Sequence, residues 1–291
     1  MFRSLLGIAP QQESDGSYSP SKVALKLSTS KVSDFERVAY SPYQGKRTKI
    51  LVIFTEQKNM KMQNGKEFST GNHPVEALLP MLHLRDAGFE FEIATPTGKP
   101  VVFEMWAMPE EDEAVAAIYQ DLRPRFEHPT PLPDVADRFL DEVDAYAAVF
   151  VPGGHGAMLG IPEDPHVGTL LRCAHDNNLF TISLCHGPGS FLATTLAGHE
   201  FLYSGYDMAV FPDSVDKMTP KIGYLPGPMP WRLGEKLQAL GANIVNTKSD
   251  KTCCLDRRLI TGASPLAADA LGKLAATTLL EQLASPAAAP S

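Results

Sequence analysis

One cysteine stands where the local sequence favours nucleophilic chemistry. In LFTISLCHGPGSFLA an apolar strand ends at Cys185, turns through His186 and the residues up to Gly189, and leads into an apolar helical segment. This arrangement is typical of a nucleophile elbow, with cysteine in place of serine. Backbone N–H groups and the helix dipole stabilise a thiolate at such a turn. We therefore predict that Cys185 is a nucleophile with a lowered pKa, at the carboxyl edge of a sheet.

A glycine turn follows another apolar strand, in VPGGHGA. Gly153 and Gly154 allow backbone N–H groups to come close to a bound oxygen, as an oxyanion hole requires. Any strand-to-helix turn can use two glycines, so the prediction depends on this turn facing Cys185 across neighbouring strand ends. In that arrangement we expect Gly153 and Gly154 to bind substrate.

A carboxyl group is expected at the same edge of the sheet. GNHPVEALLP places Glu76 in the first turn of a helix, where a carboxylate can simply complement the helix dipole. If the side chain points at Cys185 instead, the carboxyl and the thiol would share a proton, which suits acid–base catalysis. The spacing alone leaves both interpretations open.

The other three cysteines are expected to be structural. Cys173 lies on the apolar side of a helical segment, and Cys253 and Cys254 precede the last strand. Adjacent cysteines pair only with strain, so we expect reduced thiols and a reducing compartment.

The elements that position these residues alternate along the chain. Apolar runs predict strands at 48–55, 89–95, 145–154, 179–185, 241–246 and 257–262. Helical segments lie between most of them, such as the one from Pro74 to Gly88, whose proline and glycine fit helix punctuation. This alternation predicts an α/β fold with a doubly wound, mostly parallel sheet and helices on both faces.

Three segments depart from the alternation. Residues 1–46 are polar and Ser-rich and predict an N-terminal extension, wrapped on the core or partly mobile. Residues 100–142 are acidic and proline-rich, and we expect an insertion in the 47–291 core that forms a small second domain or lid. The tail at 285–291 is of low complexity and is expected to be disordered.

The composition limits the classes of protein to which this chain can belong. A chain of 291 residues with 44% hydrophobic and 21% charged residues is typical of a soluble globular protein. A net charge of -8 argues against a dedicated nucleic-acid or anionic-membrane binder. The first apolar run is shorter than the core of a signal peptide, and it breaks at Pro10. We expect a cytoplasmic protein with no membrane partner.

Five motifs together resemble a known family. GNHPVEALLP, VPGGHGA, ISLCHGP, FPDSVDK and ITGASPLAADALGKLAA are similar to the HchA-type branch of the superfamily that includes the Parkinsonism-associated deglycase and the PfpI intracellular proteases. The resemblance covers roughly residues 49–283. It implies a flavodoxin-like core with a small extra domain, and a homodimer. Members are described as heat-shock chaperones, glyoxalase III enzymes and protein deglycases.

The resemblance also implies a set of catalytic residues. The family nucleophile falls on Cys185, its histidine on His186, its glutamate on Glu76 and its triad acid on Asp216 in FPDSVD. The assignment of Asp216 rests on the resemblance, since the residue reads otherwise as a loop carboxylate. Backbone groups of Gly154 and His186 would be the donors near the thiol.

The family's zinc site does not carry over. Relatives are described with two histidines and a glutamate beside the cleft. Glu90 matches the glutamate, but Arg85 stands in place of one histidine, and the other falls near Asp121 or Leu122. One carboxylate beside an arginine is a poor zinc site, so we predict no metal and no other cofactor.

The implied reaction begins with attack of the Cys185 thiolate on the aldehyde of methylglyoxal or glyoxal. Glu76, with His186 helping, would move a proton between adjacent carbons through an enediol, and a thioester would hydrolyse to lactate without glutathione. The same site could release early adducts from glycated proteins, nucleotides or nucleic acids. The resemblance thus implies a stress-protective role against protein and DNA damage, in which DNA repair is included.

Two further functions stay open, and a third is disfavoured. A holdase chaperone would capture unfolded proteins on an apolar patch, and Phe103, Trp106 and Phe126 permit this, although core packing explains them equally well. A PfpI-like peptidase is the other alternative. Glutamine amidotransferases share a similar elbow but take a histidine from late in the chain, whereas the last histidine here is His199.

Overall fold

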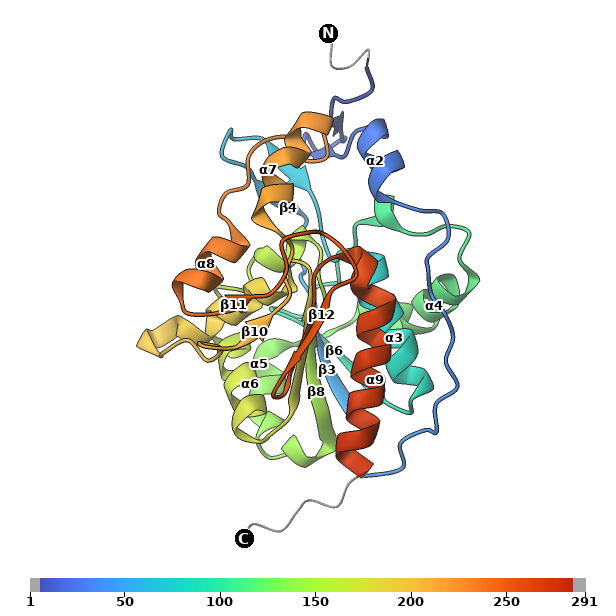
Figure 1. Ribbon diagram of the computed structural model, residues 1–291, viewed down its shortest axis with the longest axis vertical. Helices are drawn as coiled ribbons and strands as arrows, with labels where there is room; N and C mark the ends of the chain where they lie inside the picture. Colours follow the sequence, from blue (N-terminus) through green and yellow to red (C-terminus); the bar gives the residue numbers. More distant parts are fainter. Residues whose placement is uncertain (1–5, 285–291) are drawn as a thin grey trace.

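A seven-stranded sheet runs through the centre of the molecule (Figure 1). The computed structural model describes residues 6–284. Along the sheet the strand order is β12-β13-β9-β8-β3-β6-β7, and every neighbouring pair is parallel except β12 with β13. The strands are β3 (Lys49–Ile53), β6 (Glu90–Thr95), β7 (Thr130–Pro131), β8 (Tyr146–Val151), β9 (Phe180–Leu184), β12 (Cys253–Asp256) and β13 (Leu259–Gly262). The predicted mostly parallel sheet is confirmed.

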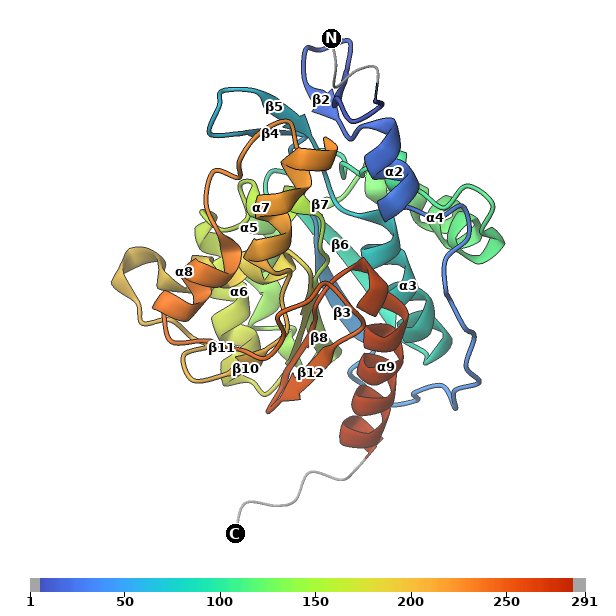
Figure 2. The ribbon, with the colours of Figure 1, turned by 45° about the horizontal axis from the view of Figure 1, so that its top comes forward.

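Helices cover both faces of this sheet (Figures 1 and 2). Successive residues of β3 alternate between the faces, so Ile50 and Val52 pack in one apolar cluster and Leu51 and Ile53 in the other. The first cluster contains α3 (Pro74–Asp86), α4 (Glu113–Glu127) and α9 (Ala268–Ala284). The second contains α5 (Leu132–Phe139), α6 (Pro165–Asp176), the 3-10 helix η4 (Gly187–Gly198) and α8 (Leu233–Ala239). This is the expected doubly wound arrangement.

A second, four-stranded sheet joins the N-terminal extension to the segment that follows β3. Its order is β1-β2-β5-β4, with β1 (Gln11–Gln12), β2 (Tyr18–Ser19), β4 (Asn59–Lys61) and β5 (Glu67–Ser69). A small apolar cluster of Met60, Met62, Phe68, Met158, Leu225 and Met229 contributes to this end of the molecule. Figure 2 shows α2 (Lys22–Ser28) and α7 (Asp213–Ile222) at the same end.

The remaining elements are short. The strand predicted at 241–246 is reduced to β11 (Asn243–Ile244), which pairs with β10 (Asp207–Met208) outside the large sheet. The other 3-10 turns are η1 (Met105–Ala107), η2 (Val143–Ala145), η3 (His155–Met158) and η5 (Pro265–Ala267). None of the helices within residues 6–284 has the length and apolar character needed to cross a membrane.

The segment 100–142 differs from the small second domain or lid that its composition suggested. Its apolar residues Val115, Ile118, Leu122 and Phe126 recur every three or four positions, which makes one face of α4 apolar. That face packs in the core cluster beside α3, and β7 extends the large sheet by pairing with β6. Many of the acidic residues of the segment face solvent, whereas Glu104 and Asp112 are buried. The tail at 285–291 lies outside the described residues.

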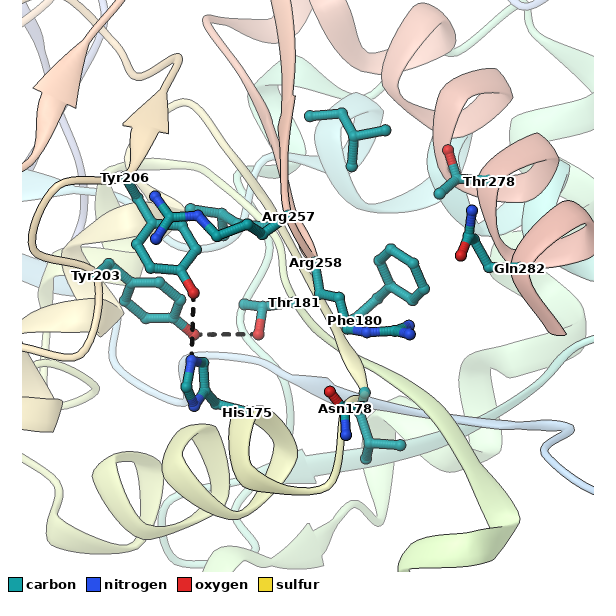
Figure 3. A pocket seen from close by; sticks show the side chains of 13 residues that line it. His175, Asn178, Phe180, Thr181, Tyr203, Tyr206, Arg257, Arg258, Thr278 and Gln282 are labelled. Carbon is teal, nitrogen blue, oxygen red and sulfur yellow. Dashed lines mark hydrogen bonds between the residues drawn. The ribbon is translucent and has the colours of Figure 1, made fainter. Parts of the chain in front are cut away.

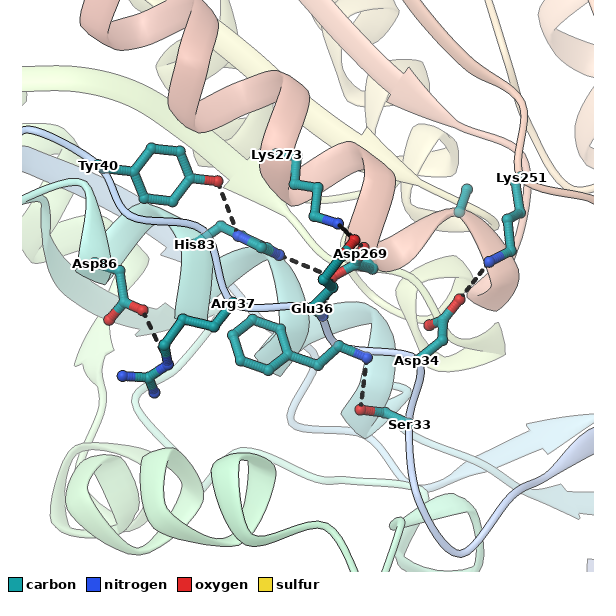
Figure 4. A network of polar contacts seen from close by, with 12 residues as sticks. Ser33, Asp34, Glu36, Arg37, Tyr40, His83, Asp86, Lys251, Asp269 and Lys273 are labelled. Carbon is teal, nitrogen blue, oxygen red and sulfur yellow. Dashed lines mark hydrogen bonds and ion pairs between the residues drawn. The ribbon is translucent and has the colours of Figure 1, made fainter.

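The extension is tied to the core by a polar network (Figure 4). His83 on α3 is buried, with its two ring nitrogens 2.9 Å from the Tyr40 hydroxyl and 2.9 Å from Asp269 Oδ1. Asp269 also accepts the backbone N–H of Glu36 at 3.0 Å and pairs with Lys273 at 2.9 Å. These contacts hold residues 36–40 against α3 and α9.

Candidate active site

Cys185 follows β9 at the carboxyl edge of the large sheet. Its φ is +57°, a left-handed conformation that side chains rarely adopt and that is typical of a nucleophile elbow. Two backbone hydrogen bonds hold the turn, from Cys185 N–H to Gly262 O at 2.8 Å and from Phe211 N–H to Cys185 O at 2.9 Å. The helix that follows is the 3-10 helix η4.

Beside the thiol lies a histidine that is oriented by a carboxylate. Cys185 Sγ is 3.3 Å from His186 Nδ1, and His186 Nε2 is 2.8 Å from Asp216 Oδ2. Asp216 is in the first turn of α7 and is buried. Although burial opposes it, the charges of His186 and His155 hold the pKa of Asp216 below its usual value. The structure therefore brings together three of the four residues that were carried over from the family.

A second histidine shares Asp216, and sequence reasoning missed it. His155 Nε2 lies 3.0 Å from Asp216 Oδ1, and its ring centroid is 3.9 Å from that of His186. His155 begins η3, directly after the glycine turn. The signal that could have found it is a histidine immediately after two glycines at a strand end.

Glu76 points inward from the first turn of α3. The residue has no exposed surface and lines the same cavity as Cys185. Burial raises the pKa of Glu76 well above its usual range, while its interactions with Cys185 and with the Gly154 N–H oppose this. Between the two interpretations left open by the sequence, the structure favours the one in which Glu76 faces the thiol.

The pKa of Cys185 differs from the sequence-based expectation. Burial raises the pKa of the Cys185 thiol well above its usual value, the charge on Glu76 raises it further, and the Gly154 N–H opposes the shift. The expected lowering by a helix dipole is wrong because the sulfur is enclosed, and a single charge is costly there. Glu76 and Cys185 therefore titrate as one coupled pair.

The glycine turn after β8 faces Cys185 because β8 and β9 are neighbouring strands. A Cβ on Gly153 would overlap Glu76 Oε2 and would lie 2.6 Å from Leu184 O and 2.8 Å from Cys185 Cβ. Gly154, with φ +100°, lines the cavity, whereas Gly153 packs behind it against Glu76 and Cys185. Of the two predicted substrate-binding glycines, the structure thus brings Gly154 to the cavity wall.

The cavity has a volume of about 280 Å³. Its polar wall comes from separate elements of the chain and consists of His73, Glu76, Glu104, His155, Cys185 and His186. Its apolar wall includes Leu27 of α2, Phe211, Ile222 and Leu266. Helix α2 of the N-terminal extension therefore borders the site.

A larger hollow lies at the other edge of the sheet. It has a volume of about 470 Å³ at the amino ends of β9 and β13, and Figure 3 shows its aromatic rings and two guanidinium groups. Arg257 stacks there over the Tyr206 ring, 3.3 Å from its centroid. The described residues that line it include no cysteine or serine, so we assign the chemistry to the smaller cavity.

The residues at the family's zinc positions do not form a metal site. Arg85 pairs with Asp121 at 3.6 Å, Leu122 is buried in the core, and Glu90 is exposed at the start of β6. Within residues 6–284 one group of three metal-type side chains converges, and it consists of His155, His186 and Asp216. Hydrogen bonds already join these three, and they belong to the arrangement around Cys185.

The other cysteines lie away from this cavity. Cys173, Cys253 and Cys254 are free thiols of intermediate burial. Burial raises the pKa of Cys253 to about 12 and also raises the pKa of the other two.

Several known proteins are similar to this chain over most of its length. No protein-family model matches it. The Protein/nucleic acid deglycase HchA of Escherichia coli O7:K1 strain IAI39 is 48% identical over 272 residues, which cover 93% of this chain and 95% of the relative. HchA of Escherichia coli K12 is 48% identical over 267 residues, or 91% of this chain and 93% of the relative.

Solved structures share the fold at low identity. The Rapid Encystment Protein of Francisella tularensis has a TM-score of 0.67 at 18% identity, covering 80% of this chain and 99% of that one. Glyoxalase III of Candida albicans has a TM-score of 0.61 at 21% identity, covering 79% of this chain and 97% of that one. Because relatives at 48% identity match more than nine-tenths of its length, the chain belongs to the HchA protein/nucleic acid deglycase family.

Proposed function

We propose that this protein is a cysteine-dependent deglycase and a glutathione-independent glyoxalase that converts methylglyoxal, glyoxal or their early adducts to hydroxy acids. One observation carries the proposal: a thiol, a carboxyl group and a histidine–aspartate pair converge on one small cavity. The relatives at 48% identity are named protein/nucleic acid deglycases, which supports the same chemistry.

The first step forms a bond between sulfur and carbon. His186 takes the thiol proton, and Asp216 stabilises the resulting imidazolium. The sulfur adds to the aldehyde carbon, and the new alkoxide receives the proton that burial keeps on Glu76. The products are a hemithioacetal, a Glu76 carboxylate and a His186 imidazolium. We assign stabilisation of the intermediate oxygen to the N–H of Gly154, which lines the cavity.

The second step moves hydrogen between carbons. The Glu76 carboxylate removes the proton on the carbon that bears sulfur, which gives an enediolate, and then returns it to the neighbouring carbon. The hydroxyl proton on the first carbon passes to the oxygen on the second, which leaves a thioester. Water then hydrolyses the resulting thioester: His186 returns its proton to the departing sulfur, the proton that water loses restores the Glu76 carboxyl group, and lactate is released. For an adduct on a lysine, arginine, cysteine or guanine group, the same thiol attack displaces the amine or thiol.

The test is the product made from methylglyoxal by purified protein without glutathione. We expect lactate, quantified by an enzymatic assay or by NMR, and release of free amine from a freshly glycated peptide. Activity should survive dialysis against a chelator. If the thiol only forms a stable adduct and neither lactate nor free amine appears, the proposal is wrong.

Holdase activity is a second candidate function. Leu27 and Leu266 line the cavity yet remain 69% and 54% exposed, so the cavity mouth has an apolar rim. By contrast, Phe103 and Phe126 pack against each other with their rings 5.0 Å apart, and Phe126 is buried in the core. A Cys185→Ala variant separates the two functions, since prevention of aggregation should survive it and carbonyl chemistry should not.

Assembly and location are proposed on narrower grounds. The family resemblance supports a homodimer, which the mass of the protein in solution would test. The four free thiols support a reducing compartment such as the cytoplasm. Stress protection that includes DNA repair follows only if adducts of nucleotides are substrates.

A further inference from the structure

A second carboxyl group lies in the cavity, and the chemistry above does not use it. Glu104 is 1% exposed and lines the cavity together with Glu76 and Cys185. Its backbone is locked to the segment before α3, because Glu104 N–H donates to Asn72 O at 3.0 Å and Asn72 N–H donates to Val102 O at 2.8 Å. These bonds fix the backbone of Glu104 beside the segment that leads into α3.

The two oxygens of the Glu104 carboxyl group differ in their hydrogen bonds. Thr70 donates its hydroxyl proton to Glu104 Oε1 at 2.6 Å. Oε2 is buried, and within residues 6–284 no group bonds to it with hydrogen-bond geometry. The described residues also offer Glu104 no ion pair with lysine or arginine. The N–H groups of His155 and Gly71 lie close enough to affect this carboxyl but form no hydrogen bond of standard geometry with Oε2. A buried oxygen of this kind can take a ligand in the cavity as its partner.

The surroundings leave Glu104 able to exchange a proton near neutral pH. Burial raises the pKa of Glu104 to about 7, against the opposing effects of the His155 charge, the Thr70 hydroxyl and the N–H groups of His155 and Gly71. Glu76 and Tyr224 face it from other elements. Burial, and then the charges of Glu104, Cys185 and Glu76, raise the pKa of Tyr224, so its phenol stays protonated.

We propose that Glu104 is a second proton-transfer residue for the isomerisation, serving the two substrate oxygens while Glu76 serves the two carbons. This inference rests on the proposed glyoxalase function. Two carboxyl groups are useful here because formation and collapse of the enediol require proton transfer at oxygen as well as at carbon. In a cis-enediol the two oxygens are neighbours, so one carboxyl group can serve both.

The protons balance through the cycle. As Glu76 removes the proton on the sulfur-bearing carbon, Glu104 gives its own proton to the neighbouring carbonyl oxygen, and the enediol forms. As Glu76 returns its proton to that neighbouring carbon, the other hydroxyl gives its proton to Glu104 and becomes the thioester carbonyl. Glu104 ends the isomerisation protonated, as it began, and no oxidant or reductant is needed.

The test compares Glu104→Gln with wild type in methylglyoxal turnover without glutathione. Glutamine keeps an oxygen to accept from Thr70 but cannot release a proton. We expect the maximal rate to fall about 100-fold or more, which is the lower end of the range for acid–base groups. Alkylation of Cys185, measured by mass spectrometry, should stay within about twofold. The exposed Glu110→Gln is the matched control and should behave as wild type.

The pH profile gives a readout that a purely structural role would not move. Glu104 must begin protonated, so kcat/KM of the wild type should fall above pH 7 with an apparent pKa of about 7. Thr70→Val removes a hydrogen bond that lowers this pKa, so the alkaline limb should move to higher pH. This second variant keeps the test valid even if Glu104→Gln does not fold.

Two outcomes would overturn the inference in distinguishable ways. If the wild type makes lactate and neither variant changes the rate or the alkaline limb, Glu104 has no part in proton transfer and the proposed function stands. If the wild type makes no lactate, the proposed function is wrong, and the inference about Glu104 is wrong as well.

Discussion

At the scale of single residues, the chemistry depends on a thiol that is enclosed and yet has a base within reach. Cys185 is only 3% exposed, but its sulfur lies 3.3 Å from His186 Nδ1 and faces the cavity. Cys173, Cys253 and Cys254 are more exposed but lie outside the cavity. Cys185 therefore differs from the other three cysteines in its position beside a base and not in its exposure.

We predict that Cys185→Ser lowers lactate formation from methylglyoxal at least ~100-fold, since an alcohol in this setting lacks the nucleophilicity of a thiolate. The melting temperature should remain close to that of wild type because the two side chains are similar in size. Cys173→Ser serves as the control and should retain activity within about twofold. Loss of activity in the control but not in Cys185→Ser would refute the assignment of the nucleophile.

His73, which precedes α3 and lines the cavity, makes stability depend on pH. Burial, and then the charge of His155, lower the pKa of His73 from 6.5 to about 3. Between these values the unfolded chain binds a proton that the folded protein does not. The free energy of unfolding should therefore be fully retained above about pH 6.5 and fall below it, by at most ~1.4 kcal/mol per pH unit from this group.

The measurement for His73 is urea unfolding at several pH values between 7.5 and 5. His73→Asn keeps a residue suited to the helix N-cap and should show a shallower loss of stability with falling pH. The exposed His199→Asn should follow the wild-type curve. Equal slopes for all three proteins would rule out this contribution of His73.

At the scale of elements, the site is built where three connections meet at one edge of the sheet. The turn after β8, the elbow after β9 and the start of α3 come together because β3, β8 and β9 are adjacent and parallel. Parallel strands present all their carboxyl ends at one edge, where such folds bind ligands. The hydrogen bond from His73 N–H to Gly153 O, at 3.0 Å, fixes the helix start against the glycine turn.

We predict that Gly153→Ala disables the enzyme and destabilises it. The added Cβ would overlap the Glu76 carboxyl and press on Leu184 O and Cys185 Cβ, so the elbow or α3 must shift. Activity should fall at least ~10-fold, and stability by about 1–3 kcal/mol, as for other overpacked positions. The comparison is Gly189→Ala, whose Cβ would come no closer than 3.4 Å to any neighbour and should be tolerated. Similar behaviour of the two variants would contradict this account of the turn.

At the scale of the whole molecule, the N-terminal extension is part of the architecture. Its strands β1 and β2 join the small sheet, α2 borders the cavity, and residues 36–40 are tied to α3 and α9 through His83 and Asp269 (Figure 4). The same segment therefore contributes both to stability and to the boundary of the site.

We predict that Asp269→Ala loosens the extension. The variant leaves the buried His83 ring and the Glu36 N–H without their acceptor, at a cost of about 1–3 kcal/mol. Urea unfolding should report the loss, and limited proteolysis should cut within residues 30–46 sooner than in wild type. Asp34→Ala breaks an exposed pair with Lys251, and its effect should stay below ~1 kcal/mol. An unchanged proteolysis pattern in Asp269→Ala would show that the network does not hold the extension.

The sequence by itself determined those parts of the molecule that local pattern controls. Apolar runs and glycine or proline punctuation predicted five strands of the large sheet, β3, β6, β8, β9 and β13, but not the edge strands β7 and β12. The strand–turn–helix pattern located the elbow at Cys185 and the glycine turn at Gly153. In a parallel sheet these signals also imply proximity, because all the strand ends meet at one edge.

Only the tertiary structure decided how distant groups combine. His155 shares Asp216 with His186 across 61 residues of chain, and no local spacing encodes that distance. The apolar face of α4 joined the core although the composition of 100–142 suggested a separate unit. The pKa values of Cys185, Glu76 and Glu104 are raised chiefly by burial. Burial is a property of everything packed around a side chain, which is why the elbow pattern alone predicted the opposite shift for Cys185.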